Sequence, residues 1–281
     1  MALTGESLGG GKRLLGNPMD PQSKPTLTSP KDNGGGKDGT SRVSPASPST
    51  GPRFEANFPL VVDPSHIEAA QAFSILRSRL LGLNKKAGIR SVIITSSDVG
   101  DGKTMVATNL ALSLGELGSK RILLVDGDLR AGSATRILKM NHLPGMGDFL
   151  QGKRQFDSVI HPTQFPNLSV APTGLVPKNT LPAILEGSHW PEFIEQAKQK
   201  FDLIIVDTVP VSAPVADLEL LLAPCEGYLL VVHMRQTRRL SLKRVSARLD
   251  AKKCLGVILN NDDELYDYAH EYYYVRPKNP K

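Results

Sequence analysis

The sequence predicts an α/β fold in which a mostly parallel sheet carries helices on both faces. Short, continuous apolar runs recur along the chain, each long enough for one buried strand, at residues 91–95, 122–125, 168–171, 203–206, 228–232 and 256–259. Stretches with helical periodicity separate most of these runs, at 181–185, 191–200, 215–222 and 240–249. Strands that are apolar throughout and alternate with helices are typical of parallel sheets buried on both faces.

The two ends of the chain differ in composition from this regular middle. The first 57 residues are rich in Gly, Pro and Ser and have almost no clustered apolar residues. Because such a segment buries too little surface to offset the entropy of ordering, we expect it to be disordered. Helical periodicity begins after Pro64, and the last apolar run ends at Asn260. We therefore predict an extension at 1–57, a folded domain at 58–260 and a tail at 261–281.

The composition favours a soluble, cytoplasmic protein. No run reaches the roughly 18 uninterrupted apolar residues that a membrane span needs, and the nearest candidate, 218–232, is broken by Pro224 and Glu226. The N-terminus lacks the apolar core of a secretion signal. Cys225 and Cys254 lie in apolar surroundings without metal-ligand spacing, so we expect ordinary core thiols in a reducing compartment.

Much of the positive charge falls on and beside one predicted helix near the C-terminal end. Leu242, Val245 and Leu249 recur there at helical spacing and predict an amphipathic helix with a basic outer face. The basic residues are Arg235, Arg238, Arg239, Lys243, Arg244, Arg248, Lys252 and Lys253. Two interpretations are open: a solvated helix face, or a docking surface for an acidic partner or lipid. The net charge of +6 is otherwise spread out, and we expect no nucleic-acid partner.

A glycine-rich loop directly follows the first apolar run and opens a helix. Its residues are Ser97, Asp98, Val99, Gly100, Asp101, Gly102, Lys103 and Thr104, followed by Met105. The two glycines let the backbone approach a polyphosphate, Lys103 supplies charge for its β- and γ-oxygens, and the Thr104 hydroxyl can ligate Mg²⁺. Ser97 stands where the consensus has its first glycine, so the match depends on the strand–loop–helix context. The loop predicts a P-loop nucleotide site for ATP and Mg²⁺.

Three aspartates follow two further apolar runs. Asp126 and Asp128 come after residues 122–125, and Asp207 comes after residues 203–206. Ligands gather at the carboxyl ends of strands in open α/β sheets, and Mg²⁺ prefers hard oxygen ligands. A single aspartate after a strand often caps a helix, but three of them beside one P-loop favour a metal–nucleotide site.

Together these motifs resemble the deviant-Walker ATPases and, among them, the bacterial tyrosine kinases of polysaccharide assembly. The matching stretches are 96–104, 122–130 and 201–210, connected by 171–174 and 177–179. The resemblance implies that Lys103 holds the phosphates and that Asp126 orients or deprotonates an incoming tyrosine. It also implies that Asp128 and Asp207 complete the metal shell begun by Thr104, and that Asn260 contacts the nucleotide base.

Two features separate this chain from the positioning ATPases of the same group. Those ATPases carry a lysine at the position of Asp98, and an aspartate there would repel phosphate. The chain also ends in an acidic segment that holds five of its six tyrosines, namely Tyr266, Tyr268, Tyr272, Tyr273 and Tyr274. In the bacterial tyrosine kinases such a cluster is where autophosphorylation occurs; the alternative is a tail that docks by aromatic contacts.

The resemblance implies a tyrosine autokinase that controls exopolysaccharide synthesis and export. It also implies a homo-oligomer, with a ring as one form, and a membrane-embedded activator, a polysaccharide co-polymerase, that holds the protein at the inner face of the membrane. The alternatives are an ATP-binding regulatory partner with little kinase activity and a positioning ATPase. Gln71 and Ser74 replace the family's Glu and Arg on the first helix, so only Arg77 of the subunit-locking pattern is present.

Overall fold

The computed structural model describes residues 60–63 and 65–261 of the chain. All of these residues belong to one of two compact units, Ala46–Lys281. The predicted extension at 1–57 and the tyrosine cluster of the tail lie outside the described residues.

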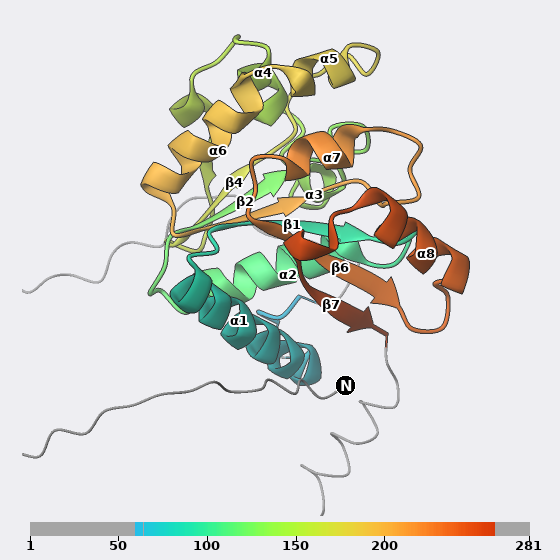
Figure 1. Ribbon diagram of the computed structural model, residues 1–281. Helices are drawn as coiled ribbons and strands as arrows, with labels where there is room; N and C mark the ends of the chain where they lie inside the picture. The colour runs from blue at the N-terminus through green and yellow to red at the C-terminus, as the bar shows by residue number, and fades with distance from the viewer. Residues whose placement is uncertain (1–59, 64, 262–281) are drawn as a thin grey trace, which may run out of the picture. The chain divides into compact units, whose positions relative to one another are not determined.

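A seven-stranded sheet forms the centre of the domain, in the order β3-β4-β2-β5-β1-β6-β7 (Figure 1). The strands are β1 (Ser91–Ser96), β2 (Ile122–Asp126), β3 (His161–Pro162), β4 (Leu168–Ala171), β5 (Leu203–Asp207), β6 (Gly227–His233) and β7 (Cys254–Asn260). Every pair is parallel except β3 with β4. The predicted fold class is confirmed, whereas β3 was not predicted because two residues are too short to show a periodicity.

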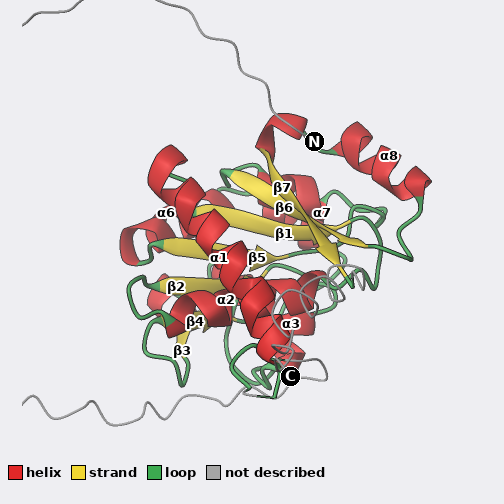
Figure 2. Ribbon diagram, turned by 90° about the horizontal axis from the view of Figure 1, so that it is seen from below, coloured by secondary structure: helices red, strands yellow, loops and turns green. Residues whose placement is uncertain are grey.

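Helices cover both faces of this sheet. They are α1 (Ile67–Ala87), α2 (Lys103–Glu116), α3 (Ser133–Ile137), α4 (Met146–Leu150), α5 (Leu181–Glu186), α6 (His189–Lys200), α7 (Asp217–Leu222) and α8 (Arg239–Arg248). Single 3₁₀ turns occur at Phe156–Val159 and Ala251–Lys253. Figure 1 shows α1 and α2 on one face, with α4 to α7 on the other, and Figure 2 views the sheet from the side of α1 and α2. None of the described helices combines the length and apolar character that crossing a bilayer requires.

Two apolar layers result from the alternation of side chains along the buried strands. On β1, Ile93 belongs to the layer under α4 to α7, whereas Val92 and Ile94 belong to the layer under α1 and α2. All three are fully buried, which explains why the sequence shows continuous apolar runs rather than alternation. Cys225 is buried in the first layer, and this burial raises the pKa of its thiol to about 12.

The buried side of α8 differs from its predicted apolar stripe. Val245 and Leu249 are buried as expected, but Leu242 is 38% exposed. Ser241 takes the buried position instead, because residues 241, 245 and 249 are spaced by four along the helix. Leu242 lies about 100° around the helix from Ser241. The prediction for Leu242 is therefore wrong, and the side chain lies on the outer surface.

Candidate functional site

The glycine-rich loop joins β1 to the N-terminus of α2. Gly100 has φ 92° and Gly102 has φ 99°, both in the left-handed region that favours glycine. Val99 stands at the loop surface and is 84% exposed. The 14-residue helix α2 begins at Lys103, directly after the loop. The loop thus leads from a strand end to a helix N-terminus, which is the setting in which backbone amides bind phosphate.

Lys103 reaches across the loop to two of the predicted aspartates. Its Nζ lies 3.3 Å from Asp128 Oδ2 and 3.7 Å from Asp207 Oδ1, and it donates to Thr104 Oγ1 at 3.2 Å. Burial lowers the pKa of Lys103, but the negative charges of Asp207 and Asp128 outweigh it and leave the pKa above its ordinary value. The lysine is therefore a permanent cation among these carboxylates.

Asp126 and Asp207 face each other at the ends of two adjacent strands. The parallel register of β2 and β5 pairs the two residues directly, and both are fully buried. Asp126 Oδ2 accepts from the Thr135 amide at 2.7 Å, and Oδ1 accepts from the Asp128 amide at 3.3 Å. Burial, reinforced by the charge of Asp207, raises the pKa of Asp126 to about 7. Burial also raises the pKa of Asp207 to about 6, although the Lys103 charge opposes it.

The oxygen atoms at this place fit a hydrated magnesium ion. The Asp207 carboxylate is buried beside the Lys103 ammonium and the Thr104 hydroxyl, yet neither of its oxygens accepts a well-formed hydrogen bond from the described residues. Ser97 Oγ is also buried without a partner in this part of the chain. No group of three or more His, Cys, Asp or Glu side chains in the described ranges makes a self-contained metal site. Hard oxygen ligands of this kind are those that Mg²⁺ prefers.

Asp101 and Asn260 hold the loop in place. The Asp101 carboxylate accepts from the Asp98 amide at 2.8 Å and from the Thr237 hydroxyl at 2.9 Å, and the residue is 2% exposed. Asn260, at the end of β7, donates through Nδ2 to the Asp101 carbonyl at 2.9 Å. The sequence placed both residues at the nucleotide; their side chains lie against the loop. Thr237 was missed, since nothing in its local sequence marks it.

The contact between Gly102 and Asn260 yields a paired prediction. A Cβ added at Gly102 would stand 2.3 Å from Asn260 Nδ2, whereas one added at Gly100 meets nothing within 4 Å. Both alanine variants carry the same left-handed strain of about 1–2 kcal/mol. We expect Gly102→Ala to bind ATP·Mg about tenfold more weakly than Gly100→Ala, measured by calorimetric titration. Equal losses in the two variants would contradict a role for the Asn260 contact.

Two arginines hold the loops that follow the acidic strand ends. Arg130, after β2, donates to both oxygens of the buried Asp217 at 2.6 and 3.0 Å. Arg248 donates to the carbonyls of Val211, Ala213 and Val215, within the loop after β5. It also binds both carboxylate oxygens of the α7 residue Glu219, at 2.8 and 2.9 Å.

Two residues assigned to the basic outer face therefore turn inward. Arg248 is occupied by these loop carbonyls, and Lys253 Nζ donates to three carbonyls, those of Leu222, Ala223 and Cys225. The helical periodicity could not show this, because the acceptors of Arg248 lie about 30 residues earlier in the chain. The remaining basic side chains of α8 stay on the surface.

The 171–174 segment forms a hydrogen bond to a residue that contacts Asp126. Thr135, which donates its amide to Asp126, accepts from the Thr173 amide at 2.9 Å through Oγ1. The Pro172 carbonyl accepts from the Met146 amide at 2.7 Å at the start of α4. The backbone of the segment thus connects the surroundings of Asp126 to α4.

Arg77 of α1 is occupied within its own chain. Its guanidinium donates to the carbonyl and hydroxyl of Ser113 at 2.8 and 3.1 Å and to the Ser74 hydroxyl at 3.1 Å. The serine that replaces the family's arginine thus helps to hold the remaining arginine against α2.

The fold and this site define a P-loop ATPase, and a model described as "AAA domain" matches residues 89–247. The chain is 32% identical to "Tyrosine-protein kinase CpsD" of Streptococcus agalactiae, covering 68% of this chain and 83% of that protein. It also resembles "The kinase domain of Escherichia coli tyrosine kinase ETK", with a TM-score of 0.61 and 27% identity over 68% of this chain and 74% of that one. The septum site-determining protein MinD from Pyrococcus horikoshii, solved with Mg-ADP, gives a TM-score of 0.51 and 27% identity, covering 61% and 70%.

These similarities confirm the expected family. The chain belongs to the bacterial tyrosine kinases, a branch of the P-loop ATPases.

Proposed function

We propose that this chain is an ATP-dependent protein-tyrosine autokinase that phosphorylates the tyrosines of its own tail. The observation that carries the proposal is the position of Asp126. This carboxylate is buried at a strand end, directly opposite Asp207, and its pKa is raised to about 7 by burial and by that neighbour. A general base performs best when its pKa lies near the working pH.

The site residues divide the reaction among them. The loop amides and Lys103 position the polyphosphate, and Thr104, Asp128 and Asp207 are the residues that would hold Mg²⁺. When bound, Mg²⁺ supplies neutralisation of the charge on the β- and γ-phosphates. The phenol oxygen of a tyrosine forms a bond to the γ-phosphorus while the bond to the β–γ bridging oxygen breaks. ADP leaves, and the phenol proton passes to Asp126.

The cellular setting is proposed from the family resemblance. We place the protein in the control of exopolysaccharide synthesis and export, at the inner face of the membrane, with a membrane-embedded polysaccharide co-polymerase as activator. The proposed acceptors are Tyr266, Tyr268, Tyr272, Tyr273 and Tyr274, on the same or a neighbouring subunit. A regulator that binds ATP with little kinase activity is the second candidate, and the internal hydrogen bonds of Arg77 favour it because they occupy the retained subunit-locking residue.

Lys103→Met tests the autokinase directly. Without the ammonium group, the phosphates and the three nearby carboxylates lose their common cation, so we expect tail phosphorylation to fall by about 10²–10³-fold. Purified protein is incubated with ATP·Mg, and phosphotyrosine is located by mass spectrometry. A variant ending at residue 261 is the control for modification outside the tail. Undiminished phosphotyrosine in isolated Lys103→Met protein would overturn the proposal.

A further inference from the structure

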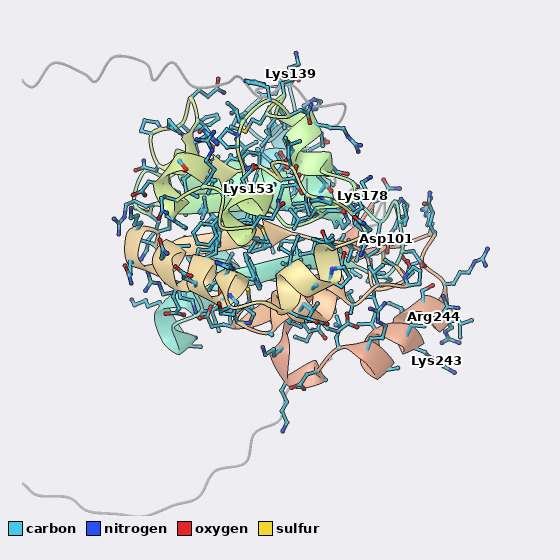
Figure 3. All side chains as sticks on the ribbon, turned by 90° about the horizontal axis from the view of Figure 1, so that it is seen from above. Asp101, Lys139, Lys153, Lys178, Lys243 and Arg244 are labelled. Carbon is cyan, nitrogen blue, oxygen red and sulfur yellow. The ribbon has the colours of Figure 1, made fainter. Side chains whose placement is uncertain are left out.

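The outer face of α8 carries a patch of cations and leucines. This α8 patch consists of Arg238, Arg239, Leu240, Leu242, Lys243 and Arg244. Leu240 is 61% exposed and Leu242 is 38% exposed, and both lie beside Arg239 and Lys243 on the same helix. Lys243 and Arg244 extend outward from the helix (Figure 3). Basic groups beside exposed large apolar side chains are typical of a binding surface.

The four cations of this patch have no acidic partner in the described part of the chain. Arg248 forms its ion pair with Glu219 on the inner side of α8. Arg238, Arg239, Lys243 and Arg244 form none with the described residues. Like charges grouped on one helix repel one another, so an acidic ligand would relieve an unfavourable interaction that the described residues leave in place.

The chain supplies such a ligand a short distance away. Asn260 ends β7, and its carbonyl accepts from the Met234 amide at 3.0 Å, in the connection that leads from β6 into α8. Residues 262–271, DDELYDYAHE, follow almost at once and contain five carboxylates and no lysine or arginine. Ten residues extend to about 33 Å, whereas a ten-residue helix is about 15 Å long.

We propose that residues 262–271 of the same chain bind the α8 patch. The carboxylates pair with Arg238, Arg239, Lys243 and Arg244, while Leu265 and the two tyrosine rings contact Leu240 and Leu242. The short tether gives the segment a high effective concentration at this patch, which favours the chain's own segment over a separate partner. The docking requires no kinase activity, so it can be tested independently of the proposed function.

Lys243 makes the contact measurable, since it is the one lysine of the patch. Full-length, phosphatase-treated protein is exposed without ATP to a carbodiimide, which joins carboxylates to amines in direct contact. We expect mass spectrometry to find Lys243 linked to residues 262–271. Arg239→Glu with Arg244→Glu, or about 0.5 M salt, should reduce this product at least about fivefold. Arg79→Glu with Lys85→Glu, an equal charge change on the exposed side of α1, should not reduce it.

Three outcomes would overturn the proposal. The first is a Lys243 product no more abundant than that of Lys252, an exposed lysine just before the opposite end of β7. The second is a product that joins heavy to light chains in a mixture of ¹⁵N-labelled and unlabelled protein, since it would assign the patch to a second copy. The third is binding to phosphatidylserine vesicles that depends on Arg239 and Arg244 without any Lys243 product, which would assign the patch to a membrane surface.

Discussion

Asp126→Asn is expected to lower phosphoryl transfer by about 10²–10⁴-fold and yet to raise the thermal stability of the metal-free protein near pH 8. Asparagine keeps the shape of the side chain and one oxygen for the Thr135 amide, but it gives up the longer bond from the Asp128 amide and cannot take the phenol proton. It also removes one negative charge from a buried group that includes Asp207 and Asp128. Transfer is measured as phosphotyrosine formed per unit time, and stability by calorimetry in EDTA.

The sign of the stability change follows from the pKa of Asp126. The carboxyl holds its proton up to about pH 7 in the folded protein, against an ordinary value of 3.8. Between these values the folded state binds more protons than the unfolded state, so the stability present at low pH is lost as the pH rises through the folded pKa. Asparagine cannot ionise, so the variant does not lose this stability at high pH. Its advantage over the wild type should vanish near pH 4, where Asp126 is protonated in the folded protein. A variant with lower stability at both pH values would contradict this account.

Asp202→Asn is a matched control with the opposite sign. The Arg121 amide and guanidinium lower the pKa of Asp202, so its carboxylate stabilises the folded protein above its unfolded pKa. Because Asp202 is partly exposed, the expected loss in the variant is small. The Asp202→Asn variant should keep the wild-type rate of tyrosine phosphorylation. Asp202 precedes β5 and so lies at the end of the sheet opposite the nucleotide site.

Gly145→Ala is expected to cost several kcal/mol of folding free energy. A Cβ at this position would lie 2.1 Å from the Pro172 carbonyl oxygen and 2.3 Å from the Gly174 amide nitrogen. Both are backbone atoms of a segment that α4 holds through hydrogen bonds to the Pro172 and Thr173 carbonyls, so they cannot move aside as a side chain would. Overpacking against fixed neighbours typically costs about 1–3 kcal/mol or more.

Gly82→Ala provides the matched control for this prediction. Gly82 lies inside α1, and a Cβ there meets nothing within 4 Å. Alanine in a helix interior is favoured over glycine by about 1 kcal/mol, so this variant should be slightly more stable than the wild type. Both variants are compared by urea unfolding. Equal stability of the two variants would contradict the prediction, since it would mean that the backbone around Gly145 moves to make room for the added Cβ.

The sequence predicted those parts of the molecule whose structure depends on residues close together in the chain. Buried parallel strands appear in the sequence as continuous apolar runs, so the positions of the strands could be predicted from these runs. The parallel register then brings Asp126 and Asp207 together at one edge of the sheet. The glycine-rich loop was recognisable because its backbone conformation requires glycine at Gly100 and Gly102.

What sequence reasoning missed depends on contacts between distant residues. Thr237 reaches Asp101 across 136 positions, and no periodicity marks such a pair. Arg248 was counted with the outer face of α8 because its charge is visible in the sequence while its carbonyl acceptors are not. Helices of five residues, such as α3 and α4, are too short to show a repeating apolar pattern.

The short helix α7 receives both arginines that hold the acidic loops. Asp217 binds Arg130 from the loop after β2, and Glu219, half a turn later, binds Arg248, which also holds the loop after β5. The six residues of α7 therefore hold both loops that follow the strand ends bearing Asp128 and Asp207. A displacement of α7 would shift both carboxylates together, so the two sides of the site would lose their alignment in concert rather than one at a time.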